Sequence, residues 1–189
     1  MKNNIQKPRL LISLKKGIFS RRYNDIYFDK LNGVNEKEYV YLEANDLANR
    51  FNLSNKFCIA EFGFGTGLNF ILTWKLWKKH RKPNSSLTYI SFENAPLSKK
   101  EMMRVYKKFT DLNVYSKELI KKLTHTYKTN RSIYFYSENI NLILIYDDFS
   151  TLANFNFMAD AWYLDGFSPN KNNEAWNENY YKQIYNRIN

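Results

Sequence analysis

The fold of this chain is decided by the stretch Glu61-Phe62-Gly63-Phe64-Gly65-Thr66-Gly67-Leu68-Asn69-Phe70. The apolar run Phe57 to Ala60 precedes it, and apolar residues at helical spacing, Leu72 to Trp77, follow it. That order of strand, glycine turn and helix is typical of a nucleotide-binding βα unit. Because glycine has no Cβ, the backbone can turn sharply here and a ligand can lie against the main chain.

The spacing of the three glycines bears on which cofactor this turn would hold. A dinucleotide-binding fold usually carries GxGxxG, with the pyrophosphate at the helix N-terminus. Here the spacing is GxGxG, and the acid Glu61 stands two residues before Gly63. The amino-acid end of S-adenosylmethionine is a zwitterion that needs an anionic partner more than a phosphate cradle. The stretch therefore favours S-adenosylmethionine, although GxGxG alone is a weak signal.

The composition fits one globular domain in a reducing compartment. The chain has 189 residues, of which 44% are hydrophobic and 17% aromatic, enough for a sizeable core. Its single cysteine, Cys58, is predicted to be a small buried strand residue and excludes a disulfide framework. The longest aliphatic run, Leu142 to Ile145, is far too short to span a bilayer. We therefore expect a soluble, cytoplasmic protein with no membrane partner.

The net charge of +11 permits a nucleic-acid substrate without proving one. Basic residues cluster within 75–82, within 99–108 and at 121–122, and such clusters suit a phosphate backbone. The alternative is codon bias in an AT-rich genome, because lysines at helical spacing usually form only a solvated face. His80 and His125 have no partner at metal-ligand spacing, so no metal site is expected.

Alternating strand and helix patterns predict an α/β fold with a parallel sheet. The first 56 residues are expected to form an N-terminal extension, with a hairpin of Asp25–Phe28 and Tyr39–Leu42 across Gly33 and a short helix over 45–51. Residues 57–189 are expected to form the nucleotide-binding domain. Its predicted strands are 57–60, 87–92, 133–136, 142–146 and 161–164, with helices after the glycine turn, over 97–109 and 116–123, and from about 174. Residues 137–139 are expected to turn a second hairpin.

Four loops are expected to converge on one cleft, because ligands of such sheets bind at the carboxyl ends of the strands. The loops are the glycine turn and those that begin at Glu93, Asp147 and Asp165. Glu93 ends the second strand, where a carboxylate can accept hydrogen bonds from both ribose hydroxyls. Glu61 would either reach the methionine ammonium or merely cap the strand edge.

The acids after the third strand leave two interpretations open. Asp148 would accept a hydrogen bond from the adenine amino group, or it would cap a helix that starts near Ser150. Asp147 stands beside it, and only one of the pair is expected to face the ligand.

The second informative segment runs from Asp165 to Asn172 and reads Asp-Gly-Phe-Ser-Pro-Asn-Lys-Asn. A carboxylate at the end of a buried strand can orient an amine, accept its proton and offset developing charge during methyl transfer. Phe167 would stack on a base or pack in the core. Pro169 would stiffen the loop, and Lys171 would contact a phosphate or only solvent.

With Asp165 to Asn172 and the glycine stretch together, the chain resembles the methyltransferase domain of the MnmC family. The similarity runs from about Ser20 to Trp176 and rests on the strings FGFGTGLNF and LDGFSPNKN. The resemblance implies a Rossmann-like class I S-adenosylmethionine-dependent methyltransferase fold. It also implies methylation of the aminomethyl group on the wobble uridine of certain tRNAs, with 5-aminomethyl-2-thiouridine converted to 5-methylaminomethyl-2-thiouridine.

The resemblance also implies roles for individual residues. Asp165 would be the catalytic carboxylate, and Phe167, Pro169 and Lys171 would contact the substrate. The cofactor would be held by the glycine loop with its neighbours and by two acids, namely Glu61, Gly63, Gly65, Gly67, Asn69, Glu93 and Asp148. Many members of the family carry a fused FAD-dependent oxidoreductase that prepares the substrate amine, so a separate enzyme is expected to supply it here.

Two departures from the family pattern bear on activity. Asp147 stands where the family usually has glycine, which would crowd the adenine pocket. The chain ends at Asn189, before the last three strands that the family's sheet includes, so the strand before Asp165 is expected at an exposed sheet edge. A frameshift, a fragmentary sequence or a second polypeptide would each explain this. The alternatives to a tRNA methyltransferase are a non-catalytic remnant and a methyltransferase for another amine.

Overall fold

A five-stranded sheet forms the centre of the computed structural model, which describes residues 10–13, 17–20, 25–28, 33–107, 109–123, 130–165 and 178–189. The strand order is β6-β7-β5-β4-β8. All neighbours are parallel except β6, which runs antiparallel to β7. The bounds are β4 Lys56–Phe62, β5 Ser86–Phe92, β6 Arg131–Phe135, β7 Ile140–Ile145 and β8 Ala161–Leu164. The predicted α/β class is confirmed.

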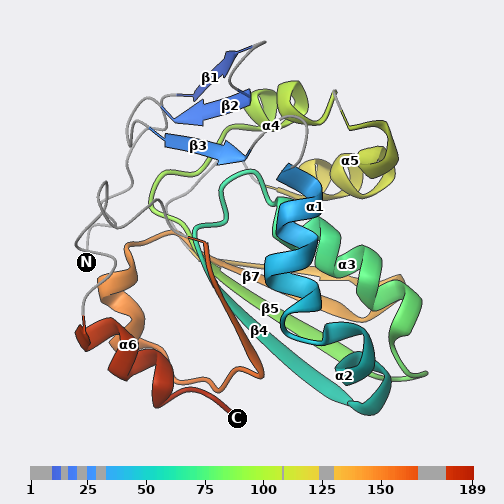
Figure 1. Cartoon of the computed structure of the whole chain (residues 1–189), viewed down its shortest axis with the longest axis vertical. Helices are drawn as coiled ribbons and strands as arrows, with labels where there is room; N and C mark the ends of the chain where they lie inside the picture. The colour runs from blue at the N-terminus through green and yellow to red at the C-terminus, as the bar shows by residue number, and fades with distance from the viewer. Residues whose placement is uncertain are drawn as a thin grey trace.

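Helices cover both faces of this sheet (Figure 1). On one side lie α1 Gly33–Lys37, the π-helix Glu38–Glu43, α2 Leu47–Leu53 and α3 Leu68–His80. Helices α4 Lys99–Tyr106 and α5 Asn113–Lys122 pack against each other, with the 3-10 turn Thr110–Leu112 between them. On the other side lie the 3-10 helix Phe149–Asn154 and α6 Glu178–Tyr185.

Three short strands near the N-terminus form a separate antiparallel sheet (Figure 1). They are β1 Leu10–Ser13, β2 Gly17–Ser20 and β3 Asp25–Phe28. The predicted strand over 25–28 is therefore present, but it pairs with β2. The division of the chain at residue 56 stays a prediction.

The predicted hairpin between Asp25–Phe28 and Tyr39–Leu42 is wrong, because residues 39–42 are helical. Leu42, Leu47 and Phe51 are buried in the same cluster as Trp77 of α3, whereas Tyr39 and Val40 are exposed. A strand would place alternate residues on opposite faces, but the buried residues of this segment lie on one helical face. Packing against α3 thus overrides the strand preference of Tyr-Val-Tyr.

The other predicted elements are present with small shifts in their ends. The turn of the second hairpin is the 3-10 helix Tyr136–Glu138, followed by Asn139 with φ of 53°. Asparagine tolerates this left-handed conformation better than most residues. Among the described strands, β8 lies at one edge of the sheet, as the sequence predicts. The predicted start of the last helix, near 174, lies outside the described residues, and α6 is seen from Glu178.

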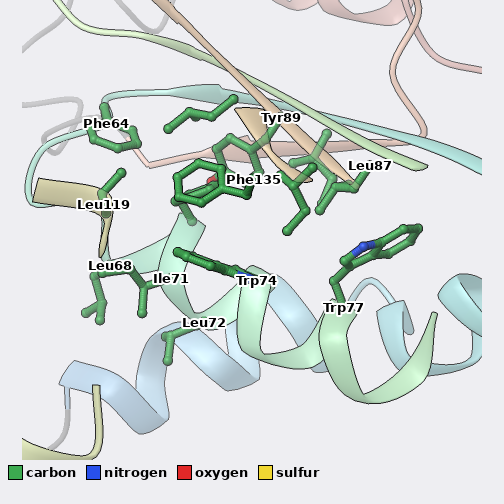
Figure 2. Packing of buried hydrophobic residues seen from close by; sticks show 14 of the residues in the cluster. Phe64, Leu68, Ile71, Leu72, Trp74, Trp77, Leu87, Tyr89, Leu119 and Phe135 are labelled. Atoms are coloured by element: carbon green, nitrogen blue, oxygen red, sulfur yellow. The ribbon is translucent and has the colours of Figure 1, made fainter. Parts of the chain in front are cut away.

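The two faces of the sheet bury two separate hydrophobic clusters. The larger cluster fills the space between the sheet and α3, where Trp74 packs against Phe135 and Trp77 lies near Leu87 (Figure 2). The smaller cluster joins Phe62, Phe92 and Phe149 on the α6 side. Side chains alternate along β4, so Phe57 and Ile59 face α3 while Cys58 and Phe62 face α6. Cys58 is partly rather than fully buried, which corrects the prediction for this residue.

Candidate functional site

The candidate site lies at the topological switch point of the sheet, between β4 and β8. From β4 the chain proceeds outward to β5 and β7, and then crosses to β8 on the other side of β4. The loops after β4 and β8 therefore diverge and leave a crevice at the carboxyl edge. Gly63, Glu93, Asp147 and Asp165 each follow a strand that ends at this edge, so the four loops lie at the same edge of the sheet, and their convergence on one cleft stays a prediction.

The glycine loop adopts a conformation that only glycine takes without strain. The φ angles are 89° at Gly63, 53° at Gly65 and 75° at Gly67. A Cβ on Gly63 would lie 2.9 Å from the main-chain oxygen of Asp165, and a Cβ on Gly67 would lie 2.9 Å from the ring of Phe64. Gly63 and Gly67 are therefore required for two reasons, because their φ angles are positive and because a Cβ at either position would meet neighbouring atoms.

A hydrogen bond from α4 fixes the middle of the glycine loop. The buried Tyr106 hydroxyl donates to the main-chain oxygen of Thr66 over 3.0 Å. The start of α4 is fixed in turn by a capping box, in which Ser98 and Glu101 bond to each other's backbone N–H. The loop is therefore supported from a helix that is remote in sequence.

Asn69 joins two carboxylates next to the glycine loop. Its Nδ2 donates to Glu61 Oε1 over 2.9 Å and to Asp165 Oδ2 over 2.8 Å. The opposite oxygen of Asp165, Oδ1, accepts from Lys37 Nζ over 2.5 Å. Asn69 Oδ1 is buried without a hydrogen-bond partner among the described residues. An acidic pair, an unused acceptor and one cation thus meet beside the glycine loop.

Glu61 is buried in the sheet, with its side chain on the face that packs against α3. It pairs in register with Ser91 of β5 and Tyr163 of β8, and Ser91 Oγ donates to Glu61 Oε2 over 2.7 Å. Burial raises the pKa of Glu61 to about 8, and the Asp165 charge adds to the rise. Glu61 does not cap the strand edge. It holds Asn69, and through Asn69 it connects to Asp165.

Glu93 binds the backbone of two loops. Its Oε2 accepts from the Gly65 N–H over 2.7 Å, and its Oε1 accepts from the Ala95 N–H over 2.6 Å. Burial raises its pKa, and the two backbone hydrogen bonds counteract part of that rise. Each carboxylate oxygen can accept a further hydrogen bond, so both retain capacity for a ligand hydroxyl. Binding of ribose by Glu93 stays a prediction.

Asp148 caps the 3-10 helix Phe149–Asn154, which is the second of the two roles left open by the sequence. Its Oδ1 accepts from the Ser150 N–H over 3.0 Å, and its Oδ2 accepts from Asn94 Nδ2 over 3.0 Å. Asp147 is turned back onto its own loop, where Oδ1 accepts from the Asp148 N–H over 2.8 Å. The contact of Asp148 with adenine stays a prediction.

A small, shallow apolar hollow lies beside the glycine loop. Phe64 and Gly65 contribute one wall, Pro96 and Leu97 another, and Leu144 and Tyr146 the sheet side. The lining is mostly apolar, as suits the flat face of a purine.

The observed groups fit S-adenosylmethionine. The unpaired, buried Asn69 Oδ1 offers an acceptor for the methionine ammonium next to two carboxylates. Glu93 offers carboxylate oxygens for ribose, and the hollow offers a small apolar surface against which adenine could lie.

Sequence reasoning missed three side chains of this site, namely Lys37, Tyr41 and Ser91. Burial and the Asp165 charge raise the pKa of Tyr41, whose hydroxyl lies 3.5 Å from the main-chain oxygen of Leu164. Ser91 was recognisable from its position two residues before Glu93 on a parallel strand. Lys37 and Tyr41 are four residues apart and lie on one face of a helix, but the strand wrongly predicted over 39–42 would not have placed them together.

The three predicted substrate residues and two classes of site remain to be compared with the described part of the chain. Phe167, Pro169 and Lys171 lie outside the described residues. Within the described ranges, no group of three or more His, Cys, Asp or Glu side chains could hold a metal ion. Likewise, none of the described helices has the length and apolar character needed to cross a membrane.

Comparison with known proteins gives consistent similarities. A family model described as S-adenosyl-L-methionine-dependent methyltransferase matches residues 110–189. The tRNA 5-methylaminomethyl-2-thiouridine biosynthesis bifunctional protein MnmC of Legionella pneumophila (strain Lens) is 36% identical over 185 residues, covering 88% of this chain and 28% of the relative. The protein of the same name from Leptospira borgpetersenii serovar Hardjo-bovis (strain JB197) is 39% identical over 163 residues, covering 84% and 25%.

A solved structure shows a similar fold. The crystal structure of MNMC2 from Aquifex aeolicus superposes with a TM-score of 0.74 at 21% sequence identity, covering 100% of this chain and 59% of that chain. The chain spans about a quarter of the length of the curated relatives it matches, such as 28% of the Legionella pneumophila protein.

Proposed function

We propose that the chain is a member of the MnmC methyltransferase-domain family of S-adenosylmethionine-dependent methyltransferases and that it methylates the aminomethyl group of a modified wobble uridine in tRNA. The reaction converts 5-aminomethyl-2-thiouridine to 5-methylaminomethyl-2-thiouridine. The observation that carries the proposal is the position of Asp165 directly after β8, where its main chain lies against Gly63 of the glycine loop and its carboxylate accepts a hydrogen bond from Asn69.

The chemistry of the step needs a neutral amine held near an electrophilic methyl group. S-adenosylmethionine, when bound, supplies that methyl group on a sulfonium. Asn69 holds Asp165 Oδ2, which fixes the orientation of the carboxylate, and Oδ1, which accepts from Lys37, is the oxygen at which a substrate ammonium would replace that lysine. We expect the carboxylate to bind the substrate ammonium, accept its proton and leave the nitrogen lone pair free for attack.

The basic surfaces supply the second support. Lys99 and Lys100 of α4 and Lys121 and Lys122 of α5 lie on two helices that pack together. Clustered lysines attract the phosphates of an RNA without reading its sequence. The net charge of +11 also favours binding to a negatively charged RNA. The choice of tRNA and any oxidoreductase that supplies the amine remain predictions.

The experiment that tests the function compares methyl acceptors. Purified chain and S-adenosylmethionine are incubated with tRNA that carries 5-aminomethyl-2-thiouridine, with the same tRNA lacking the aminomethyl group, and with small primary amines. Nucleoside analysis by mass spectrometry should show the methylated wobble nucleoside only in the first reaction.

Two other outcomes would overturn the proposal. Methylation of the small amines but not of the tRNA would indicate a methyltransferase for another amine. Binding of S-adenosylmethionine in calorimetry without transfer to any acceptor would indicate a remnant that no longer catalyses the reaction.

A further inference from the structure

Lys37 places a primary amine directly on the carboxylate proposed to bind the substrate amine. The last residue of α1 extends to the end of β8, where Lys37 Nζ lies 2.5 Å from Asp165 Oδ1. The two side chains are only 12% and 23% exposed. Lysine and the aminomethyl substrate share the same reacting group, a primary amine on a CH₂.

The surroundings of Lys37 confine this amine. Its Nζ lies 5.2 Å from the centre of the Tyr41 ring, at cation–π distance. Other lysine ion pairs are far more open, since Lys78, paired with Glu138, is 57% exposed and Lys182, paired with Glu178, is 70% exposed. Lys37 is therefore held near one carboxylate oxygen.

The carboxylate that binds Lys37 is also next to the cofactor loop. The main-chain oxygen of Asp165 lies where a Cβ on Gly63 would approach to 2.9 Å, and Asp165 Oδ2 shares the Asn69 amide with Glu61. Lys37 contacts Asp165, and Asp165 contacts Asn69. The amine of Lys37 is therefore separated by a single side chain from the groups that fit the amino-acid end of the cofactor.

We propose that Lys37 occupies the acceptor-amine position at Asp165 and is itself methylated when S-adenosylmethionine is bound without a substrate. This inference rests on the proposed function, because it uses the same carboxylate and the same methyl donor. The Lys37 ammonium transfers a proton to Asp165, and the freed lone pair attacks the methyl carbon. A nitrogen–carbon bond forms, the sulfur–methyl bond breaks with its electron pair going to sulfur, and S-adenosylhomocysteine leaves.

A purely structural role makes a different prediction. The Lys37 cation would then only offset the charges of Asp165 and Glu61, and its nitrogen would never accept a methyl group. Substitution of Lys37 would affect stability under either role, so stability does not separate them. The chemical state of Lys37 after exposure to the methyl donor does.

The test uses S-adenosylmethionine with a deuterated methyl group, the purified full chain and no tRNA. Peptide mass spectrometry should find the labelled methyl on Lys37, and at least about tenfold less on Lys78, because only Lys37 is held at the reacting position. The Lys37→Arg variant, which keeps the cation, should lose that label. Wild-type chain that binds the cofactor but leaves Lys37 unlabelled would overturn the inference.

A second readout does not require the cofactor. In the chain alone, acetylation of Lys37 by a soluble acylating reagent should be slower than that of the exposed Lys78, and Asp165→Asn should accelerate it. Equal rates at the two lysines in the wild type would mean that Lys37 is not held on Asp165, and this too would overturn the inference.

The failures of the two proposals can be distinguished. Methylation of tRNA without labelling of Lys37 overturns the inference and leaves the function standing. Labelling of Lys37 without methylation of tRNA supports the inference and contradicts the proposed substrate. An absence of both overturns both.

Discussion

Asn69 is the residue on which the geometry of the site depends. Its amide nitrogen donates to both Glu61 and Asp165, and these two acids would otherwise repel each other across a small buried space. Lys37 offsets the charge on the outer side of Asp165. A buried carboxylate, an amide and a second carboxylate thus form one connected network, in which a change at one member alters the next.

Replacement of Asp165 with Asn should abolish the proton acceptor while keeping the shape of the side chain. We expect turnover to fall about 10²- to 10⁴-fold, the usual contribution of a positioned acid or base. Affinity for S-adenosylmethionine should change little. Rates of tRNA methylation and calorimetric titration measure the two effects, with the exposed Asp111→Asn as the matched control. Full activity in Asp165→Asn would remove its catalytic role.

Glu61 should make the folded chain less stable as the pH rises. Its pKa is about 8 in the folded state against 4.5 when exposed, so between these values the folded chain keeps a proton that the unfolded chain releases. The contribution of Glu61 to stability is therefore fully present below about 4.5, falls as the pH rises and is lost above about 8. The expected loss is on the order of 5 kcal/mol, from about 1.4 kcal/mol for each pH unit between the two pKa values.

Glu61→Gln should remove that dependence. Thermal melting from about pH 5 to pH 9 should show a flatter profile for Glu61→Gln than for the wild type or for the exposed Glu43→Gln, because glutamine does not titrate. Parallel profiles for all three proteins would mean that Glu61 titrates normally.

At the scale of elements, short segments are held by contacts remote in sequence. The π-helix Glu38–Glu43 follows α1 directly and buries Leu42 against the core. Helix α4 fixes the glycine loop through Tyr106. Local preference is decisive for the long strands and for α3, but it fails where a short segment has one buried face supplied by a neighbour.

Val40→Ala distinguishes the helical segment from the strand that its residues favour. Val40 is 44% exposed, so its replacement removes little packing. In a helix, alanine should stabilise the chain by up to about 0.5 kcal/mol, whereas in a strand it should destabilise it. Val114→Ala, at a position 76% exposed on α5, is the matched helical control. Chemical denaturation that gives opposite signs for the two variants would contradict the helix at 38–43.

At the scale of the whole molecule, aromatic side chains bind the helical layer to the sheet. Trp74 projects from α3 toward Phe135, and Trp77 projects from the same helix toward Leu87 (Figure 2). Both indoles are almost fully buried, but their N–H groups differ. Trp77 Nε1 donates to the main-chain oxygen of Glu138 over 2.8 Å, whereas Trp74 Nε1 has no hydrogen-bond partner among the described residues.

The two tryptophans provide a matched pair of substitutions. Trp77→Phe leaves the Glu138 oxygen without its donor, whereas Trp74→Phe removes an unsatisfied donor. We expect Trp77→Phe to cost about 1–3 kcal/mol more in the free energy of unfolding, beyond the loss of packing common to both. Urea denaturation measures the difference. Equal losses would show that the bond to Glu138 contributes nothing to stability.

The sequence by itself determined the order of the main elements and the positions of the chemical groups along it. Glycines at 63, 65 and 67, an acid at the end of each of two strands and the apolar strand runs are local patterns, and the resemblance to a known family rests on the same residues. A carboxylate after a parallel strand must lie at the binding edge of the sheet whatever its neighbours are, because strand direction fixes that position.

Only the tertiary structure decided which of these groups meet. Residues 39–42 became helical because α3 offered them a buried face, and that change brought Lys37 and Tyr41 to Asp165. Glu61 connects to Asp165 through Asn69, and Asp148 caps a helix. Contacts between residues so far apart in sequence depend on the packing of whole elements, which no local pattern encodes.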